Sequence, residues 1–248
     1  MNSRFLHHSG FSLIELTIVL VIVAILSSGL MFGLTTQSDT TNARESQRQL
    51  DAAKDALLGF AMTNGRLPCP ADLATPPACP SPSDSTSLCL GLEGSFKADG
   101  TTCTSQYGVL PWLTLGLSET DPWGNHFTYF VSDQFSAKVP DGAQASFTLD
   151  SGVTSTAGLA KITNLSSQGS TNIAIDVAAV IVSHGKRSAG AYLSDGTKIP
   201  NAMGDELKNA NNTQTFVAST PTPDFDDQLV WISQHILKSR LVAVGKLP

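Results

Sequence analysis

The sequence has too little basic charge for a surface that binds nucleic acid. Its 248 residues carry 15 Lys and Arg against 21 Asp and Glu, a formal net charge of −6. Binding to nucleic acid depends on clustered Lys and Arg side chains. The short basic group formed by Lys186, Arg187 and Lys198 is better explained as solvated loop. We therefore expect no nucleic-acid partner.

The sequence also lacks the short motifs of several enzyme and metal-binding classes. It has no Cys-x-x-Cys pair, and no His lies between Cys69 and Cys103, so the spacing of a zinc site is absent. It has no Gly-rich phosphate loop. Ser183-His184-Gly185 lacks the flanking glycines of a nucleophile elbow, so His184 is interpreted as a loop histidine after a strand. These absences predict a protein that is not an enzyme.

The N-terminal part lacks both charge and proline. From Phe11 to Leu34 the only charged residue is Glu15, and no proline occurs between Phe11 and Arg66. At ~1.5 Å per residue, a helix over this run covers a hydrocarbon core of ~30 Å. A bare carboxylate at that depth costs about 2.5–3.5 kcal/mol, so Glu15 needs a partner. Cleavage after Gly10 would supply one, because the new amine of Phe11 lies one helical turn away, in the same chain or a neighbouring one.

The segment Gly10-Phe11-Ser12-Leu13-Ile14-Glu15 resembles the class III signal of type IV prepilins and type II secretion pseudopilins. This resemblance implies cleavage after Gly10 by an inner-membrane prepilin peptidase and N-methylation of Phe11. It also implies that Glu15 pairs with the Phe11 amine of an adjacent subunit during assembly. The implied partners are that peptidase, other pilin or pseudopilin subunits, an inner-membrane assembly platform and the lipid bilayer.

The order of these features predicts four parts of the chain. They are a leader at 1–10, a transmembrane and filament-core helix at 11–34, an amphipathic continuation of the helix at 35–65, and a periplasmic or extracellular pilin-like domain at 66–248. Arg4 and the N-terminal amine should hold the leader in the cytoplasm. We therefore expect a single crossing of the inner membrane, followed by display on a surface filament.

The second half of the helix shows an apolar stripe at steps of three and four residues, which predicts packing against a sheet. Asn64-Gly65 is a C-terminal stop signal. Strands are predicted at 126–131, 145–149, 173–183 and 229–233, and a last helix at 233–244, with polar connections at 161–171 and 197–215. The fold class is therefore α+β, a long helix packed on an antiparallel sheet. The stripe consists of Ala43, Leu50, Ala53, Leu57, Phe60 and Ala61.

Asp121-Pro122-Trp123-Gly124 has the residues of a β-turn, with Asp first, Pro second and Gly fourth. It resembles the turn that precedes the sheet in major pseudopilins. The alternative interpretation of this tetrapeptide is a generic β-turn, and both interpretations predict a strand directly after it.

Four cysteines lie in one loop-rich window: Cys69, Cys79, Cys89 and Cys103. An even, clustered number in an exported domain predicts two disulfides that staple the loop region. Three connectivities are open, and of these we expect the nested one, with Cys69–Cys103 around Cys79–Cys89.

Asp224, Asp226 and Asp227 form an acidic cluster before the last predicted strand. Carboxylates at these spacings are either solvated or coordinate a Ca²⁺ ion. Major pseudopilins also use a C-terminal acidic loop for calcium. We expect a solvated cap of the strand and no cofactor, with calcium as the alternative.

These features together predict a structural subunit of a type IV pilus-like filament, and the large stapled domain favours a minor pilin or pseudopilin. Three alternatives stay open: a minor pseudopilin of a type II secretion system, a DNA-binding minor pilin for uptake, and a membrane-tethered enzyme. A basic surface strip would favour DNA binding. A pocket with His184 and carboxylates would favour an enzyme.

Overall fold

The computed structural model describes residues 12–74, 90–153 and 155–247, with the backbone alone for residues 27–37. The predicted leader, Gly10 and Phe11 lie outside the described residues, as do Cys79 and Cys89. The chain forms two compact units, residues 1–42 and residues 43–248.

Helix α1 runs from Leu13 to Asn64. It ends where the Asn-Gly signal predicts: Gly65 takes a φ of +72°, and its N–H donates to the Ala61 carbonyl at 2.7 Å. In the first unit, the side chains of residues 13–26 are all exposed. Among the described residues, no helix combines the length and the apolarity needed to cross a membrane. The spanning segment predicted at 11–34 therefore stays a prediction.

The second unit is built around one central strand, β5 (Asn172–Ser183). The main sheet has the order β1 (Tyr107–Val109), β3 (Thr128–Val131), β5, β4 (Ala160–Thr163) and β7 (Thr215–Val217), while β8 (Gln228–Ser233) also pairs with β5. All of these pairs are antiparallel except β4–β7, which is parallel. A second small sheet joins β2 (Asn125–His126) to β6 (Tyr192–Leu193). The predicted antiparallel sheet is therefore confirmed except at one edge.

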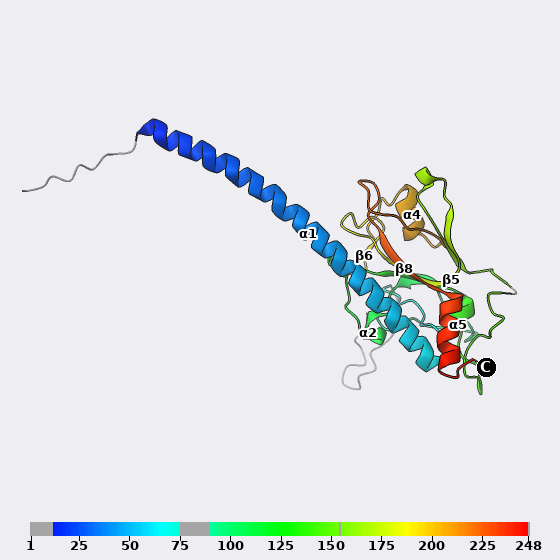
Figure 1. Cartoon of the computed structure of the whole chain (residues 1–248). Helices are drawn as coiled ribbons and strands as arrows, with labels where there is room; N and C mark the ends of the chain where they lie inside the picture. The colour runs from blue at the N-terminus through cyan, green and yellow to red at the C-terminus, as the bar shows by residue number, and fades with distance from the viewer. Residues whose placement is uncertain (1–11, 75–89, 154, 248) are drawn as a thin grey trace, which may run out of the picture. The chain divides into compact units, whose positions relative to one another are not determined.

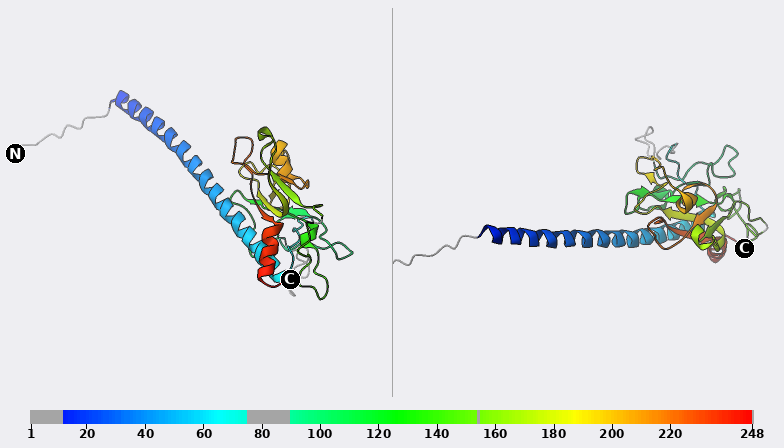
Figure 2. Two further views of the ribbon diagram at one scale, coloured as in Figure 1. Left: turned by 45° about the vertical axis from the view of Figure 1, so that its right-hand side comes forward. Right: turned by 90° about the horizontal axis from the view of Figure 1, so that it is seen from above.

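The remaining elements are short helices. They are α2 (Trp112–Leu115), α3 (Asp133–Ser136), the 3₁₀ turn η1 (Ser166–Gln168), α4 (Gly204–Ala210) and α5 (Gln234–Ala243). Figure 1 shows α5 beside the last part of α1, and Figure 2 gives two further views of the same arrangement.

The core has two layers because successive side chains of β5 point to opposite faces of the sheet. Ala179 and Ile181 face residues 43–64 of α1, where Leu50 and Leu57 are fully buried, and α5 contributes Leu237 to the same cluster. On the other face, side chains of β5, β3, β4 and β7 form a second cluster. Its buried members are Phe130, Ala160, Ile162, Val177, Val180, Val182 and Phe216.

The strand predicted at 145–149 is wrong. The chain turns there instead, since the Thr148 N–H donates to the Ser151 hydroxyl at 3.0 Å and the Ser151 N–H donates to the Thr148 carbonyl at 3.2 Å. Phe147 is buried edge-on against Phe135, with ring centroids 4.8 Å apart. Phe147 therefore packs in the hydrophobic core although its segment forms a turn and not a strand.

The two segments predicted as polar connections are also partly wrong. The first contains most of β4, and the second contains α4 and the start of β7. Each strand is only three or four residues long, so neither shows a clear alternating pattern. Their pairing joins segments far apart in the sequence, with Ile162 opposite Phe216.

Candidate functional site

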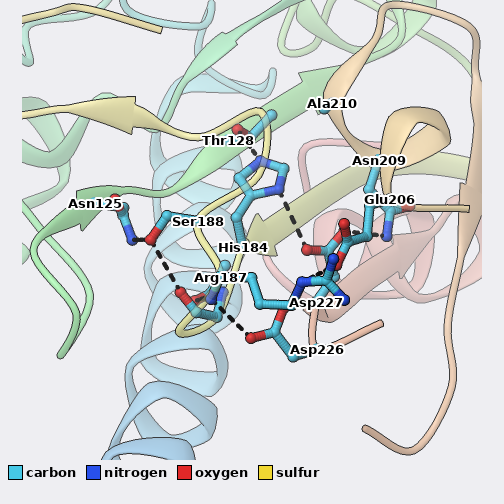
Figure 3. Close-up of polar contacts among 12 residues, drawn as sticks. Asn125, Thr128, His184, Arg187, Ser188, Glu206, Asn209, Ala210, Asp226 and Asp227 are labelled. Atoms are coloured by element: carbon cyan, nitrogen blue, oxygen red, sulfur yellow. Dashed lines mark hydrogen bonds and ion pairs between the residues drawn. The ribbon is translucent and has the colours of Figure 1, made fainter. Parts of the chain in front are cut away.

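A buried polar network lies at the C-terminal end of β5. His184 follows the strand, Glu206 lies on α4, and Asp226 and Asp227 precede β8. Gly185, with a φ of +60°, allows this approach, because a Cβ there would lie 2.6 Å from the Asp226 carbonyl oxygen. The network therefore brings together three segments that are distant in the sequence (Figure 3).

His184 links the sheet to the acidic side chains. Its Nε2 lies 2.9 Å from the Thr128 hydroxyl, and its Nδ1 lies 3.4 Å from Asp227 Oδ1 (Figure 3). The side chains of His184 and Asp227 are both fully buried. Asp227 Oδ2 accepts a hydrogen bond from Asn209 Nδ2 at 2.8 Å. Thus Asp227 Oδ2 has a hydrogen-bond donor, and Asp227 Oδ1 faces the ring of His184.

Three carboxylates converge beside this histidine. Glu206, Asp226 and Asp227 each offer one oxygen, and these oxygens lie within 4.8 Å of one another. Arg187 contacts two of them: its backbone N–H donates to Asp226 Oδ2 at 2.9 Å, and Nε of its charged guanidinium lies 3.5 Å from Glu206 Oε1. Glu206 Oε1, Asp226 Oδ1 and Asp227 Oδ1 are buried and make no hydrogen bond within the described chain.

Burial makes this concentration of negative charge costly. The pKa of Glu206 is raised first by burial and then by the Asp227 carboxylate. The pKa of Asp226 is also raised by burial, against the hydrogen bond from the Arg187 N–H. Ca²⁺ binds carboxylate oxygens at about 2.3–2.6 Å, so two ligands of one Ca²⁺ ion lie at most about 5 Å apart. The oxygens of this cluster fit that limit.

The acidic set differs from the one that the sequence predicts. Asp226 and Asp227 belong to the cluster, whereas the Asp224 side chain is fully exposed and lies 4.0 Å from Arg187 Nη1. Glu206 takes the third place, from a segment predicted as a polar connection. No local signal marks Glu206, because its approach to Asp227 depends on how α4 packs near the parallel edge strand β7.

The turn at Asp121 is hydrogen-bonded to Ser183, the last residue of β5. Asp121 Oδ1 accepts from the N–H groups of Trp123 and Asn125, each at 3.0 Å, and its Oδ2 accepts from the Ser183 hydroxyl at 2.6 Å. The Gly124 N–H closes the turn on the Asp121 carbonyl at 3.0 Å. The predicted turn is confirmed, and its carboxylate anchors β5. Burial raises the pKa of this carboxyl despite the three hydrogen bonds.

At the other end of the described chain, Glu15 lies in the first turn of α1. Its N–H donates to the Ser12 carbonyl at 3.0 Å, so the helix begins within the segment that resembles a prepilin signal. Residues 6–31 match the family described as the prokaryotic N-terminal methylation motif. The chain therefore carries the type IV pilin and pseudopilin signal, and its α+β fold is consistent with a pilin-like architecture. No curated protein and no solved structure matched the chain.

The loop region contains the outer disulfide of the predicted nested pair. Cys69 and Cys103 form a disulfide. Glu93 strengthens the same region, because its carboxylate pairs with both terminal nitrogens of Arg66 and accepts from the Cys69 N–H at 2.8 Å. The inner bridge of the nested pattern stays a prediction, since Cys79 and Cys89 lie outside the described residues.

In the row formed by Thr128, His184 and Asp227, the imidazole lies between a hydroxyl and a carboxylate. All three residues are buried. Two cavities in the described part of the chain are lined by other residues, around Tyr192 and around Leu117. We therefore interpret the row as part of the polar network that closes this end of the sheet.

Proposed function

We propose that the chain is a structural subunit of a type IV pilus-like filament, assembled through its N-terminal helix. The observation that carries this proposal is the methylation motif at residues 6–31, whose part from Leu13 onward forms the start of α1. In this account a prepilin peptidase cuts after Gly10, and Phe11 becomes the methylated terminus. The size of the second unit and its disulfide favour a minor pilin or minor pseudopilin.

The proposed path begins in the inner membrane. The apolar run at 11–34 is the single anchor, and the domain lies on the periplasmic side until the subunit is extracted into a filament. The exposed apolar side chains of residues 13–26 support a membrane anchor, because in an isolated subunit these side chains would face water. A lipid bilayer and then the helices of other subunits would cover them. The assembly platform of the inner membrane is the expected site of transfer.

Glu15 gives the sharpest test of this path. In the membrane its carboxylate costs free energy, so Glu15→Leu should insert as well as the wild type or better. In a filament it would pair with the Phe11 amine of a neighbour, and breaking a buried pair costs about 3–5 kcal/mol. We therefore expect normal membrane abundance and strongly reduced recovery in sheared filaments.

The matched control is Thr17→Leu, which removes a polar group of the same apolar run without removing charge. It should leave filament recovery unchanged. Equal recovery of Glu15→Leu and wild type would contradict the pairing. A subunit at the filament tip lacks one neighbour, so the equivalent variant of the major subunit should be measured beside it. Co-purification with a pilus or with a secretion pseudopilus separates the two systems.

We also propose that the cluster of Glu206, Asp226 and Asp227 binds a divalent cation with oxygen preference, with Ca²⁺ as the first candidate. The three buried oxygens without hydrogen bonds support this, and His184 Nδ1, also without one, is directed at Asp227. A bound cation would offset the charge of the cluster. It would tie α4 to the segment that leads into β8.

Thermal unfolding with CaCl₂, MgCl₂ or chelator tests this site. At a hundredfold excess over Kd, a cation adds about 2.7 kcal/mol to the free energy of unfolding. For a domain of this size that raises Tm by about 5–10 °C. The rise should disappear in Glu206→Gln and Asp226→Asn.

The matched control is Asp224→Asn, whose carboxylate is exposed and outside the cluster. It should keep the full rise in Tm. Loss of the rise in this variant alone would place the ion in the loop instead. An unchanged Tm of the wild type in both salts would contradict the proposed cation site.

A further inference from the structure

A cavity of about 360 Å³ lies in the domain, apart from the sites proposed so far. It opens between residues 70–74, residues 94–95, residues 104–109 and the hairpin that carries Tyr192. Its volume falls at the lower end of the range for small-molecule sites, about 300–1,000 Å³. None of its lining residues belongs to the acidic cluster or to α1.

The walls of this cavity are held by specific contacts. Ala71 pairs with Val109 of β1, with the Ala71 N–H donating to the Val109 carbonyl at 2.9 Å. Gly108 permits this approach, because a Cβ there would lie 2.8 Å from the Ala71 carbonyl oxygen. The disulfide joins Cys69 and Cys103, two residues before Ala71 and one before the lining residue Thr104. Backbone hydrogen bonds and a disulfide therefore connect the segments that line the cavity.

Aromatic and polar groups share the lining. Tyr107 and Tyr192 supply rings, and Asp72 supplies a carboxylate. Burial and then the Asp72 carboxylate raise the pKa of Tyr192, so its phenol stays a neutral hydrogen-bond donor. Exposed residues with hydroxyl groups complete the wall; they are Ser95, Thr104 and Ser105. The Thr104 hydroxyl donates to the Ser95 carbonyl at 2.9 Å and the Ser105 hydroxyl to the Tyr107 carbonyl at 2.6 Å, so these two oxygens face a ligand as acceptors.

The charges around the cavity disfavour an ionic ligand of either sign. Lys198 Nζ lies 5.6 Å from the ring centroid of Tyr107 and 5.2 Å from that of Tyr192, so a cation already occupies one side of both rings. That ammonium also donates to the Ala210 carbonyl at 2.6 Å. The lining residues include the Asp72 carboxylate and no Lys or Arg among those that the structure describes, which disfavours an anion.

We propose that this cavity binds a neutral saccharide unit. A sugar ring has an apolar C–H face, which packs on aromatic side chains, and a rim of hydroxyls, which exchange hydrogen bonds with carboxylate and hydroxyl groups. Tyr107 and Tyr192 fit the first requirement. Asp72 and the Ser95 hydroxyl fit the second, and the oxygens of Thr104 and Ser105 add two acceptors. A filament subunit with such a site would recognise a surface glycan.

The test is saturation-transfer NMR with the full chain in detergent, followed by calorimetry. The probes are glucose, galactose, mannose and N-acetylglucosamine at millimolar concentration, with glucosamine as the cationic arm and sialic acid as the anionic arm. We expect at least one neutral sugar to bind and both charged arms to bind more weakly. Stronger binding of a charged arm, or no binding of any neutral sugar, would overturn the proposal.

Two variants and a matched control locate the binding. Asp72→Asn should weaken it at least tenfold, and Tyr192→Ala should abolish it. The control is Asp195→Asn: Asp195 accepts the N–H of Thr197 at 2.8 Å, as Asp72 accepts that of Ala74, but Asp195 does not line the cavity. Tryptophan fluorescence reports folding of each variant. Unchanged sugar binding by folded Asp72→Asn would contradict the assignment.

Discussion

Residues 43–64 of α1 hold the sheet through fully buried side chains, and truncating one of them should destabilise the domain. The Leu57 side chain is 0% exposed and packs in one cluster with Tyr129 and Ile181. A buried Leu→Ala change loses transfer free energy and leaves a cavity, at a cost of about 2–5 kcal/mol. Leu57→Ala should therefore lower the free energy of unfolding by about 3 kcal/mol.

Leu20→Ala is the matched control on the same helix. Leu20 is 60% exposed and lies in the first unit, outside the domain. Its truncation should change the free energy of unfolding of the domain by less than about 0.5 kcal/mol. The same chemical change is therefore expected to destabilise the domain in one half of α1 and to leave its stability nearly unchanged in the other.

Urea titration of the full chain in detergent measures both variants. The three tryptophans, Trp112, Trp123 and Trp231, all lie in the second unit, so their fluorescence reports the domain alone. With a urea m-value of about 2–3 kcal/mol per M, a loss of 3 kcal/mol lowers the midpoint by about 1–1.5 M. Equal midpoints for Leu57→Ala and Leu20→Ala would refute the packing described here.

Other contacts give smaller, separate predictions. Replacing both Cys69 and Cys103 by Ser should cost about 2–4 kcal/mol in the same titration, and an unchanged midpoint would argue against the bridge. Glu93→Gln weakens the paired hydrogen bonds from Arg66, and we expect a loss of about 1–3 kcal/mol, with no loss if the pair is only a surface contact. Burial raises the pKa of Asp121 in the folded state, so wild-type stability should fall as pH rises through that pKa. Asp121→Asn should lack this fall, and parallel stability curves for the two proteins between about pH 3 and 7 would contradict it.

The helices and the central strand could be predicted from the sequence because their signals are local. The apolar positions of α1 recur every three or four residues, and Leu50, Ala53, Leu57 and Ala61 are buried as expected, whereas Ala43 and Phe60 of the same predicted stripe are half-buried. The nearly continuous apolar run from Ala174 to Val182 predicts a central strand, and β5 is buried on both faces from Val177 onward. In each case the apolar pattern that predicts the element lies within one continuous segment of the sequence.

The edge of the sheet could not be predicted in this way. Strands β4 and β7 are short and partly polar, and they are stabilised by pairing with each other across a long stretch of chain. Part of that edge is completed by a side chain, since the Val217 N–H donates to Asn209 Oδ1 at 2.7 Å. Such a contact has no periodicity to reveal it.

The candidate cation site shows the same limit. The pair Asp226-Asp227 is visible in the sequence as an acidic cluster, but the spacing indicates the wrong residue as its third carboxylate. Asp224 is closer in sequence, whereas Glu206 is brought in by the packing of α4. Spacing along the chain cannot distinguish a carboxylate that points to solvent from one that approaches through tertiary structure.

The central claim is that the chain is processed between Gly10 and Phe11 and then assembled through its N-terminal helix. Mass spectrometry of the N-terminal peptide, from protein extracted from membranes of the native host, tests this most directly. We predict N-methyl-Phe11 as the first residue, and an uncleaved chain when Gly10 is replaced by a large residue such as Val. A mature protein that begins at Met1 would contradict it.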